Sequence, residues 1–565
     1  MKYIPLMIKG VRMAVGKKII FICVVLFGFS LVLGMNGCTK KKLANDTLYF
    51  NLSTEPPTLD PTLSTDTTSS LVIRNIFDGL VAYDITNPEL PVVPKVAKSW
   101  EISKNRKTYT FSLRDDVYWS DGKKVTAHDF LYSWERLLTP ATGSEYAYFL
   151  FDIENAKAFN SGQLKDFSKV GIKAVNDQTF KVTLKEPVAY FLAISAFPVL
   201  SPIRKDIIEK YKDQWTEPQN IVTNGPFKVA QWKHDYELIL ERNDAYFGEK
   251  AKLKRVHCYM VNEASTALSL FQTRKLDVIR EVPVPDIPKL KKLPEFHSGN
   301  YFSIYYLGFN TKKAPFDNVD IRRAVNAAIN RVELVEVIGN YGQIPTSSLI
   351  PKNLLGYNQN LGIKFNLEKA KVFMEKAGYT QETSAGKTAW VNKKTKQKLP
   401  PITITYNTNE AHKTIVENMQ AQLKRNLGFD VEILNQEWKV YLKTLQTSDG
   451  NLPTAPFHIY RLGWNADYPD PSTFTDMFTS YSEQNHTGWK STEYDHLVEK
   501  AKVTAEKEKR SQLYDQAQKL LLEDGSVIIP IYVYSFASMF RDEIKGVHLN
   551  PLDEWQLDQI WLTRK

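Results

Sequence analysis

A short segment near the C-terminal end has residue types that suit the binding of a small charged molecule. It reads IYRLGWNADYPDPSTF, at positions 459–474. Its apolar and aromatic start predicts a strand, which Pro469 and Pro471 end because proline cannot donate to a strand ladder. Arg461 and Asp467 bracket the end of this strand. Opposite charges at that spacing suit a zwitterion with an amine at one end and a carboxylate at the other. The same pattern also fits a solvated loop with an incidental ion pair.

The elements that would position these residues form a βαβ unit. Residues 402–406 predict a strand, a helix follows from about His412 to Gly428, and alternating apolar residues at 431 and 433 predict a second strand. The sheet is therefore at least partly parallel, and ligands of such sheets bind at the carboxyl ends of the strands. His412 and Trp438 follow two of these ends, and Arg461 on the next apolar run is expected to add a third position.

A second helix is expected from Asp320. Its apolar stripe has the i, i+4, i+7, i+8, i+11 spacing of one helix face. The members of this stripe are Ile321, Val325, Ala328, Ile329 and Val332.

The N-terminal 37 residues predict an export signal. They hold five basic residues and no acidic one, and an apolar run at 19–35 leads to Asn36-Gly37-Cys38. A small residue followed by cysteine resembles the lipobox of bacterial lipoproteins, in which the thiol is acylated. Because the apolar run is also near the lower length limit of a membrane span, an uncleaved signal anchor is the alternative. Both interpretations place the globular body outside the cytoplasm.

Composition argues against nucleic acid and against disulfides. The formal net charge is +10 and the pI about 9.0, but half of that charge lies in the export signal. The body is close to balance, so the high pI does not indicate a nucleic-acid partner. Cys258 is the one cysteine beyond Cys38, and its apolar neighbours predict a buried structural thiol. Stability must then come from apolar cores, which a chain of 565 residues with 43% hydrophobic content can build.

Motifs for catalysis or metal binding are missing from the sequence. There is no GxSxG, HExxH, CxxC or GxGxxG, and the nine histidines include no helical pair at i, i+4. We therefore expect no metal site, no cofactor and no enzymatic activity. A secreted hydrolase built without a local motif is the alternative from another class.

Long segments of the chain resemble the extracellular solute-binding proteins of family 5, in particular those that bind oligopeptides for ABC importers. The resemblance runs from about Leu48 to the C-terminus. Nine segments occur in the family's order, which makes the match specific. They are residues 54–61, 76–84, 94–103, 109–138, 220–229, 305–324, 434–438, 459–474 and 527–534.

The resemblance implies an α/β fold of the type II periplasmic-binding-protein class, with two lobes joined by two crossover strands and an extra subdomain in the first lobe. The implied division is a signal peptide with lipobox at 1–37 and lobe I at 38–305, with the subdomain at about 78–205. Lobe II spans 306–535, and residues 536–565 return to lobe I.

The resemblance also implies roles for particular residues. Asp467 matches the carboxylate that binds a peptide's amine, and Arg461 and His412 match basic residues that meet its carboxylate end. Leu445 departs from the pattern, because peptide binders can carry a second arginine there. Cleft and pocket positions are Trp438, Trp464, Gly463, Tyr146, Tyr301, Tyr534, Thr65 and Thr67.

The expected function is capture of short peptides in the cleft and their delivery to a membrane permease. The protein is expected to be an exported monomer, held at the outer side of the cell membrane by a lipid at Cys38. Within the family, a receptor for cell-wall (murein) peptides or for nickel or haem is the alternative.

Overall fold

The computed structural model describes residues 46–188, 190–339, 341–384, 387–446 and 451–564. The predicted signal and Cys38 lie outside these ranges. No helix within them is both long and apolar enough to cross a membrane.

A large mixed sheet is the main structure of the chain. Its strand order is β17-β16-β18-β12-β19-β11-β1-β10-β9-β8, and β13 (Ile344–Pro345) pairs with β19. Because β16 runs parallel to β17 and to β18, the predicted βαβ unit is confirmed. The other strands are β1 (Thr47–Asn51), β8 (Phe227–Lys233), β9 (Glu237–Arg242), β10 (Arg255–Tyr259), β11 (Val278–Ile279), β16 (Ile402–Asn407), β17 (Val431–Gln436) and β18 (Ile459–Asn465).

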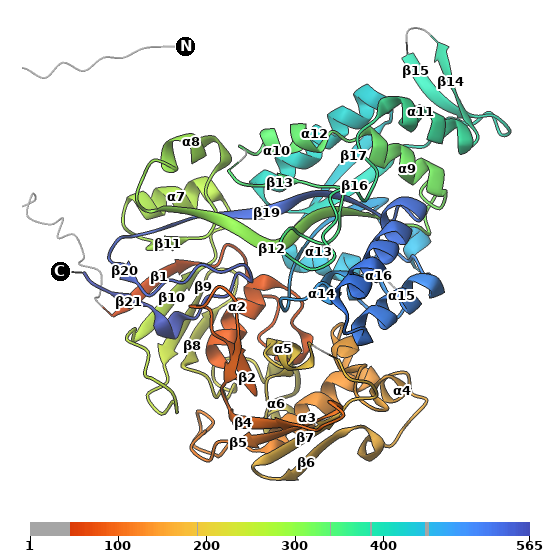
Figure 1. Cartoon of the computed structure of the whole chain (residues 1–565). Helices are drawn as coiled ribbons and strands as arrows, with labels where there is room; N and C mark the ends of the chain where they lie inside the picture. The colour runs from red at the N-terminus through yellow and green to blue at the C-terminus, as the bar shows by residue number, and fades with distance from the viewer. Residues whose placement is uncertain (1–45, 189, 340, 385–386, 447–450, 565) are drawn as a thin grey trace, which may run out of the picture. The chain divides into compact units, whose positions relative to one another are not determined.

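Two long strands run antiparallel through the middle of this sheet, β12 (Phe296–Phe309) and β19 (Ile528–Phe540) (Figure 1). One end of β19 pairs with β11, whereas the C-terminal half of β12 pairs with β18. These strands therefore pass from the N-terminal group of strands to the C-terminal group, as expected of two crossover strands.

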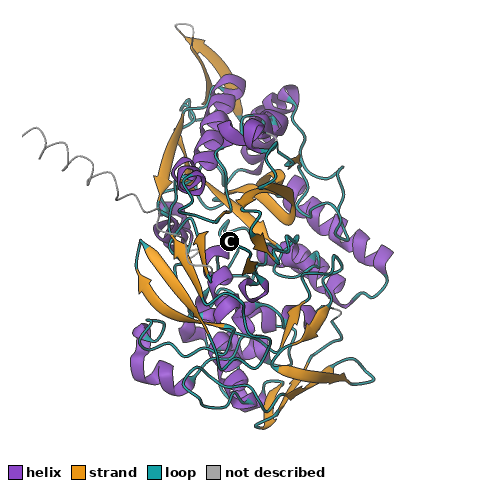
Figure 2. Ribbon diagram, turned by 90° about the vertical axis from the view of Figure 1, so that its left-hand side faces the viewer, coloured by secondary structure: helices purple, strands orange, loops and turns teal. Residues whose placement is uncertain are grey.

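A four-stranded antiparallel sheet, β4-β5-β7-β6, forms a separate body in the lower half of Figures 1 and 2. Buried positions alternate with more accessible ones in β5 and β7, as expected when one face of a sheet covers a core. The strands of this sheet and of the three smaller pairs are β4 (Ala97–Ile102), β5 (Thr108–Leu113), β6 (Ile172–Asn176), β7 (Thr179–Thr183), β2 (Val81–Tyr83), β3 (Val92–Pro94), β14 (Tyr379–Ser384), β15 (Lys387–Asn392), β20 (Ile544–Lys545) and β21 (Trp561–Leu562).

Helices cover the sheets and complete three apolar cores. One core packs α9 to α12 against β16 to β18, another joins the N-terminal strands to the four-stranded sheet and to α14–α16, and a small one lies around α7 and α8. The helices are α2 (Thr67–Ile76), α3 (Ala127–Leu138), α4 (Ala156–Asn160), α5 (Phe191–Ile194), α6 (Lys205–Tyr211), α7 (Ala264–Gln272), α8 (Ile287–Leu290), α9 (Val319–Ala328), α10 (Arg331–Glu336), α11 (Leu367–Lys376), α12 (Glu410–Leu427), α13 (Trp438–Leu445), α14 (Ser472–Thr475), α15 (Thr492–Val503) and α16 (Lys507–Lys519).

The helix expected from Asp320 is shorter than its apolar stripe suggested. α9 ends at Ala328, and the Asn330 side chain caps a new helix by accepting from the backbone N–H groups of Val332 and Glu333. Val332 is 54% exposed. Its assignment to the buried stripe was therefore wrong, because an N-cap restarts the helix in a new direction.

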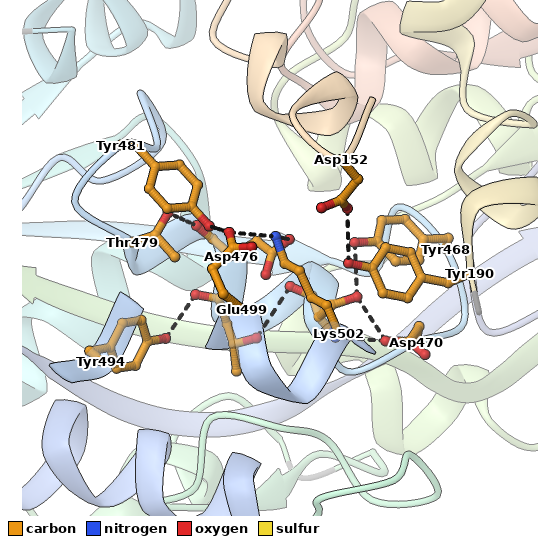
Figure 3. Close-up of polar contacts among 12 residues, drawn as sticks. Asp152, Tyr190, Tyr468, Asp470, Asp476, Thr479, Tyr481, Tyr494, Glu499 and Lys502 are labelled. Carbon is orange, nitrogen blue, oxygen red and sulfur yellow. Dashed lines mark hydrogen bonds and ion pairs between the residues drawn. The ribbon is translucent and has the colours of Figure 1, made fainter. Parts of the chain in front are cut away.

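A network of buried polar side chains joins the body that contains the four-stranded sheet to the C-terminal helices (Figure 3). Lys502 on α15 pairs with Asp476 at 2.9 Å, and the two side chains are 2% and 5% exposed. Tyr190 stacks on Tyr468 with ring centres 5.4 Å apart, and its hydroxyl donates to Asp152. The Tyr190–Tyr468 stack crosses this contact, whereas the Lys502–Asp476 pair lies within its C-terminal side.

Cys258 is a buried free thiol, as predicted. It lies on β10, where burial raises its pKa to about 12. The thiolate is thus disfavoured, and the residue acts as a small apolar side chain.

Candidate functional site

One cavity of about 350 Å³ contains all eleven predicted binding residues in its lining. This volume is typical of a site for a small ligand. Most of the lining comes from residues 52–146, from residues 280–284 just after β11, from the two crossover strands and from the segment 407–486. The lining residues that the sequence predicted are Thr65, Thr67, Tyr146, Tyr301, His412, Trp438, Arg461, Gly463, Trp464, Asp467 and Tyr534.

Asp467 is a buried carboxyl that has no cationic partner within 4 Å among the described residues. It follows the end of β18 and is 6% exposed. The Tyr146 hydroxyl donates to one of its oxygens at 3.2 Å and the Thr473 hydroxyl to the other at 3.1 Å. Burial raises the pKa of Asp467 to about 7, although these two donors and the more distant Arg74 act against the shift. A ligand ammonium would supply the missing positive charge.

Thr473, which the sequence did not single out, holds Asp467 and Trp464 in place. Its hydroxyl accepts from the Asp467 backbone N–H at 3.1 Å and from the Trp464 indole at 3.2 Å, and it donates to the Asp467 carboxylate. One donor and two acceptor sites are all that a hydroxyl offers. The carboxylate is thereby oriented before any ligand arrives.

Arg461 is buried and has no carboxylate partner within 4 Å in the described part of the chain. It is 6% exposed, and its guanidinium donates to Asn407 at 3.1 Å and to the Tyr534 hydroxyl. The guanidinium also lies over the Tyr305 ring, 4.5 Å from its centre. A ligand carboxylate would supply the negative charge that Arg461 lacks.

Two capped helices place His412 and Trp438 at the ends of parallel strands. Asn409 follows β16 and accepts from the His412 backbone N–H at the start of α12, and Glu437 caps α13, which begins at Trp438. Burial and then the charge of Arg461 keep the pKa of His412 well below its usual range. Both effects favour the neutral imidazole, whose Nδ1 has no hydrogen-bond partner among the described residues.

The remaining predicted residues line other parts of the cavity wall. Tyr301 donates to Asp553 at 2.8 Å, and Thr65 and Thr67 lie at the start of α2. Gly463 lies under the Tyr534 side chain, where an added Cβ would come within 2.6 Å of the tyrosine oxygen. The absence of a side chain at 463 therefore lets Tyr534 reach Arg461.

Position 445 is not part of the cavity. Leu445 is fully buried on the same side of α13 as Tyr441, whereas Trp438, Leu442 and Gln446 line the cavity. Leu445 therefore lies on the core side of the helix, and its departure from the family pattern puts an apolar side chain in that core.

The solvated-loop alternative for residues 459–474 is also wrong. Arg461 and Asp467 are both buried, and neither forms an ion pair with the other. Two opposite charges line one cavity without neutralising each other. The described residues contain no cluster of three or more potential metal ligands.

Comparison with known proteins places the chain among binding proteins for solutes. Residues 91–486 match the model of the bacterial extracellular solute-binding proteins, family 5. The oligopeptide-binding protein OppA of Bacillus subtilis is 36% identical over 91% of this chain and 92% of its own. The structure of Haemophilus influenzae OppA in complex with the peptide RPPGFSPFR has a TM-score of 0.83 at 30% identity, over 92% of this chain and 99% of its own. The fold is thus the two-lobed type II clamp.

Two structures of one relative differ in their similarity to this chain. The murein tripeptide-binding protein MppA of Escherichia coli matches at 29% identity over 92% of this chain, with a TM-score of 0.83 over 99% of its own. Its unliganded open form reaches only 0.60, over 97% of its own chain. The arrangement of the lobes here is therefore unlike that open form.

Proposed function

Because the chain belongs to the bacterial extracellular solute-binding proteins of family 5, we propose that it captures short peptides in the cavity and delivers them to the permease of an ABC importer. The observation that carries this proposal is the pair of uncompensated buried charges, Asp467 and Arg461, that line one cavity. A peptide with free ends supplies an ammonium for one and a carboxylate for the other. Relatives whose names state oligopeptide binding support the choice of ligand.

The proposed roles follow from charge and hydrogen bonding. Asp467 binds the α-amine; an ammonium about 4 Å away gains roughly 4 kcal/mol of Coulomb energy at an effective dielectric of 20, before desolvation. Arg461 binds the carboxylate, and the neutral His412 donates a hydrogen bond to it. Trp438, Trp464, Tyr146, Tyr301 and Tyr534 exclude bulk water, which keeps these charges from being screened, and Thr65, Thr67 and Gly463 present backbone to the ligand.

We further propose that ligand binding closes the clamp and that the permease recognises the closed form. Residues 38–305 would form lobe I with its subdomain at about 78–205, residues 306–535 would form lobe II, and 536–565 would return to lobe I. The lower similarity to the open form of MppA supports closure about the cavity.

Membrane attachment is a separate proposal, in which Cys38 is acylated after export and tethers a monomer at the outer side of the membrane. A Cys38→Ser variant expressed in a bacterium should be released from the membrane fraction, as immunoblotting of fractions would show. A variant that stays bound would favour the uncleaved anchor.

Mass spectrometry of ligands released from purified protein tests the main proposal. A mixture of short peptides with free N-termini is the expected result. A single murein peptide would favour a cell-wall receptor, and a metal chelate or haem would contradict the peptide proposal. Turnover of a peptide library would indicate a hydrolase and contradict our proposal that the chain is not an enzyme.

A further inference from the structure

The cavity contains more negative than positive charge, beyond what a peptide's amine would neutralise. Five carboxyls and three arginines line it. Arg74 pairs with Glu554 at 2.6 Å, and Arg280 pairs with Asp553. In the described part of the chain, this leaves three carboxyls with no Lys or Arg within 4 Å besides Asp467. They are Asp66, Glu145 and Glu281.

Asp66 has one buried carboxylate oxygen that accepts no hydrogen bond from the described residues. Its Oδ1 caps α2 by accepting from Thr68 and Ser69 at 2.9 and 3.0 Å. Its Oδ2 has no hydrogen-bond partner among the described residues, although the residue is only 8% exposed. Burial raises the pKa of Asp66, and nearby Ser69 and Trp438 only partly offset that effect. An unpaired buried acceptor is costly, so a donor from the ligand would be favoured here.

Glu145 lies at the C-terminal end of α13, the helix that begins at Trp438. Its carboxylate accepts from Gln446, just after the end of α13. Burial raises the pKa of Glu145 to about 7, and the charge of Glu483 adds to that rise. No cationic group of the described chain lies within 4 Å of it.

Between these two carboxyls, α13 presents a wall that suits a long cationic side chain. Trp438, Leu442 and Gln446 are spaced by four residues, share one face of the helix and line the cavity. A lysine or arginine stem can lie along Leu442 with its charge near the Trp438 ring. A carboxyl at either end of this wall can then accept from the cationic head.

We propose that Asp66 and Glu145 form a subsite for a cationic ligand side chain, so that the protein prefers peptides that contain lysine or arginine. This inference rests on the proposed peptide function. It adds a selective element to a receptor that otherwise binds groups common to all peptides.

Calorimetric titration with tripeptides of alanine, each with one residue replaced, tests the subsite. Lysine and norleucine are compared at each position, because norleucine keeps the apolar stem and lacks the ammonium. At one position, lysine should bind at least about tenfold more tightly than norleucine, a difference of about 1.4 kcal/mol. Both peptides carry the same α-amine, so the contribution of Asp467 cancels in the ratio of their affinities.

Two conservative variants assign the effect to these carboxyls. Glu145→Gln and Asp66→Asn should each lower the ratio of the affinity for the lysine peptide to that for the norleucine peptide at least threefold. The affinity for the norleucine peptide itself should change less than threefold. Asparagine still caps a helix, so Asp66→Asn should fold. The control is Glu281→Gln, which removes the same charge from an exposed side chain of the lining and should leave the ratio unchanged.

The subsite proposal is contradicted if the lysine peptide binds no more tightly than the norleucine peptide at any position. It is also contradicted if Glu281→Gln lowers the affinity ratio as much as the other two variants do. In that case trialanine would still bind and only the selectivity claim would fail. If no tripeptide binds at all, the proposed function itself fails.

Discussion

The titration of Asp467 should make peptide affinity depend on pH. Its pKa in the ligand-free protein is raised to about 7, mainly by burial, and a bound ammonium would lower it. Binding below pH 7 must therefore displace a proton. We predict that the affinity for a neutral, unblocked tripeptide falls by up to about tenfold for each pH unit between 7 and 5. Calorimetric titrations across this range measure the slope, which should be smaller in Asp467→Asn; equal slopes would contradict the role of Asp467.

At the level of single residues, the sequence predicted those whose type alone indicates a role. Asp467, Arg461 and the aromatic walls follow from charge, spacing and family resemblance, and all of them line the cavity. Thr473 was missed because its role depends on a fold that brings one hydroxyl to both an indole and a carboxylate. Asp66 was missed because a helix cap looks the same in sequence whether or not its second oxygen faces a cavity.

At the level of elements, the contact between Gly463 of β18 and the Tyr534 side chain of β19 positions Arg461, for which we propose binding of the peptide carboxylate. A Gly463→Ala variant should displace Tyr534, because the added Cβ would lie 2.6 Å from its oxygen. Arg461 would then lose one of its two hydrogen-bond partners, and a free-acid tripeptide should bind about tenfold more weakly. The C-terminally amidated tripeptide should change little. Tyr534→Phe is the matched control, since it removes the hydroxyl without crowding; equal losses for acid and amide would contradict this role.

Helices and strands were predicted correctly where the apolar periodicity and the residues that end an element agreed. The βαβ unit follows from apolar periodicity and from Gly428, which ends α12 in the left-handed region. The stripe through Val332 failed because an asparagine cap overrode the periodicity. The core position of Leu445 was not predicted either, because periodicity does not show which face of α13 turns toward the cavity.

At the level of the whole molecule, the buried pair Lys502–Asp476 links α15 to the segment that follows α14, on the C-terminal side of the contact with the four-stranded sheet (Figure 3). Lys502→Met should lower the free energy of unfolding by about 3–5 kcal/mol, because it leaves Asp476 buried without its charge partner. Chemical denaturation followed by tryptophan fluorescence measures the loss.

A matched control separates burial from charge in this prediction. Lys371 lies 3.2 Å from Glu368, and the two side chains are 43% and 84% exposed, so Lys371→Met should cost at most about 1 kcal/mol. The double variant Lys502→Met/Asp476→Leu should regain most of the stability. A Lys502→Met variant as stable as Lys371→Met would contradict the account.

The order of segments along the chain identified the clamp, since nine matches in one order are specific. The cavity could not be derived in the same way, because it is built from residues as far apart in sequence as Thr65 and Tyr534. Only tertiary packing brings such positions to one wall.

Binding of a tripeptide with a free amine and of its N-acetylated form, to the parent protein and to Asp467→Asn, tests the central claim most directly. We predict that Asp467→Asn weakens the free peptide by about 2–5 kcal/mol, the usual loss when one partner of a buried charge pair is removed. The acetylated peptide, which has no ammonium to pair, should bind both proteins with nearly equal affinity in calorimetric titration. Equal losses for the two peptides would contradict the assignment of Asp467 as the amine-binding group.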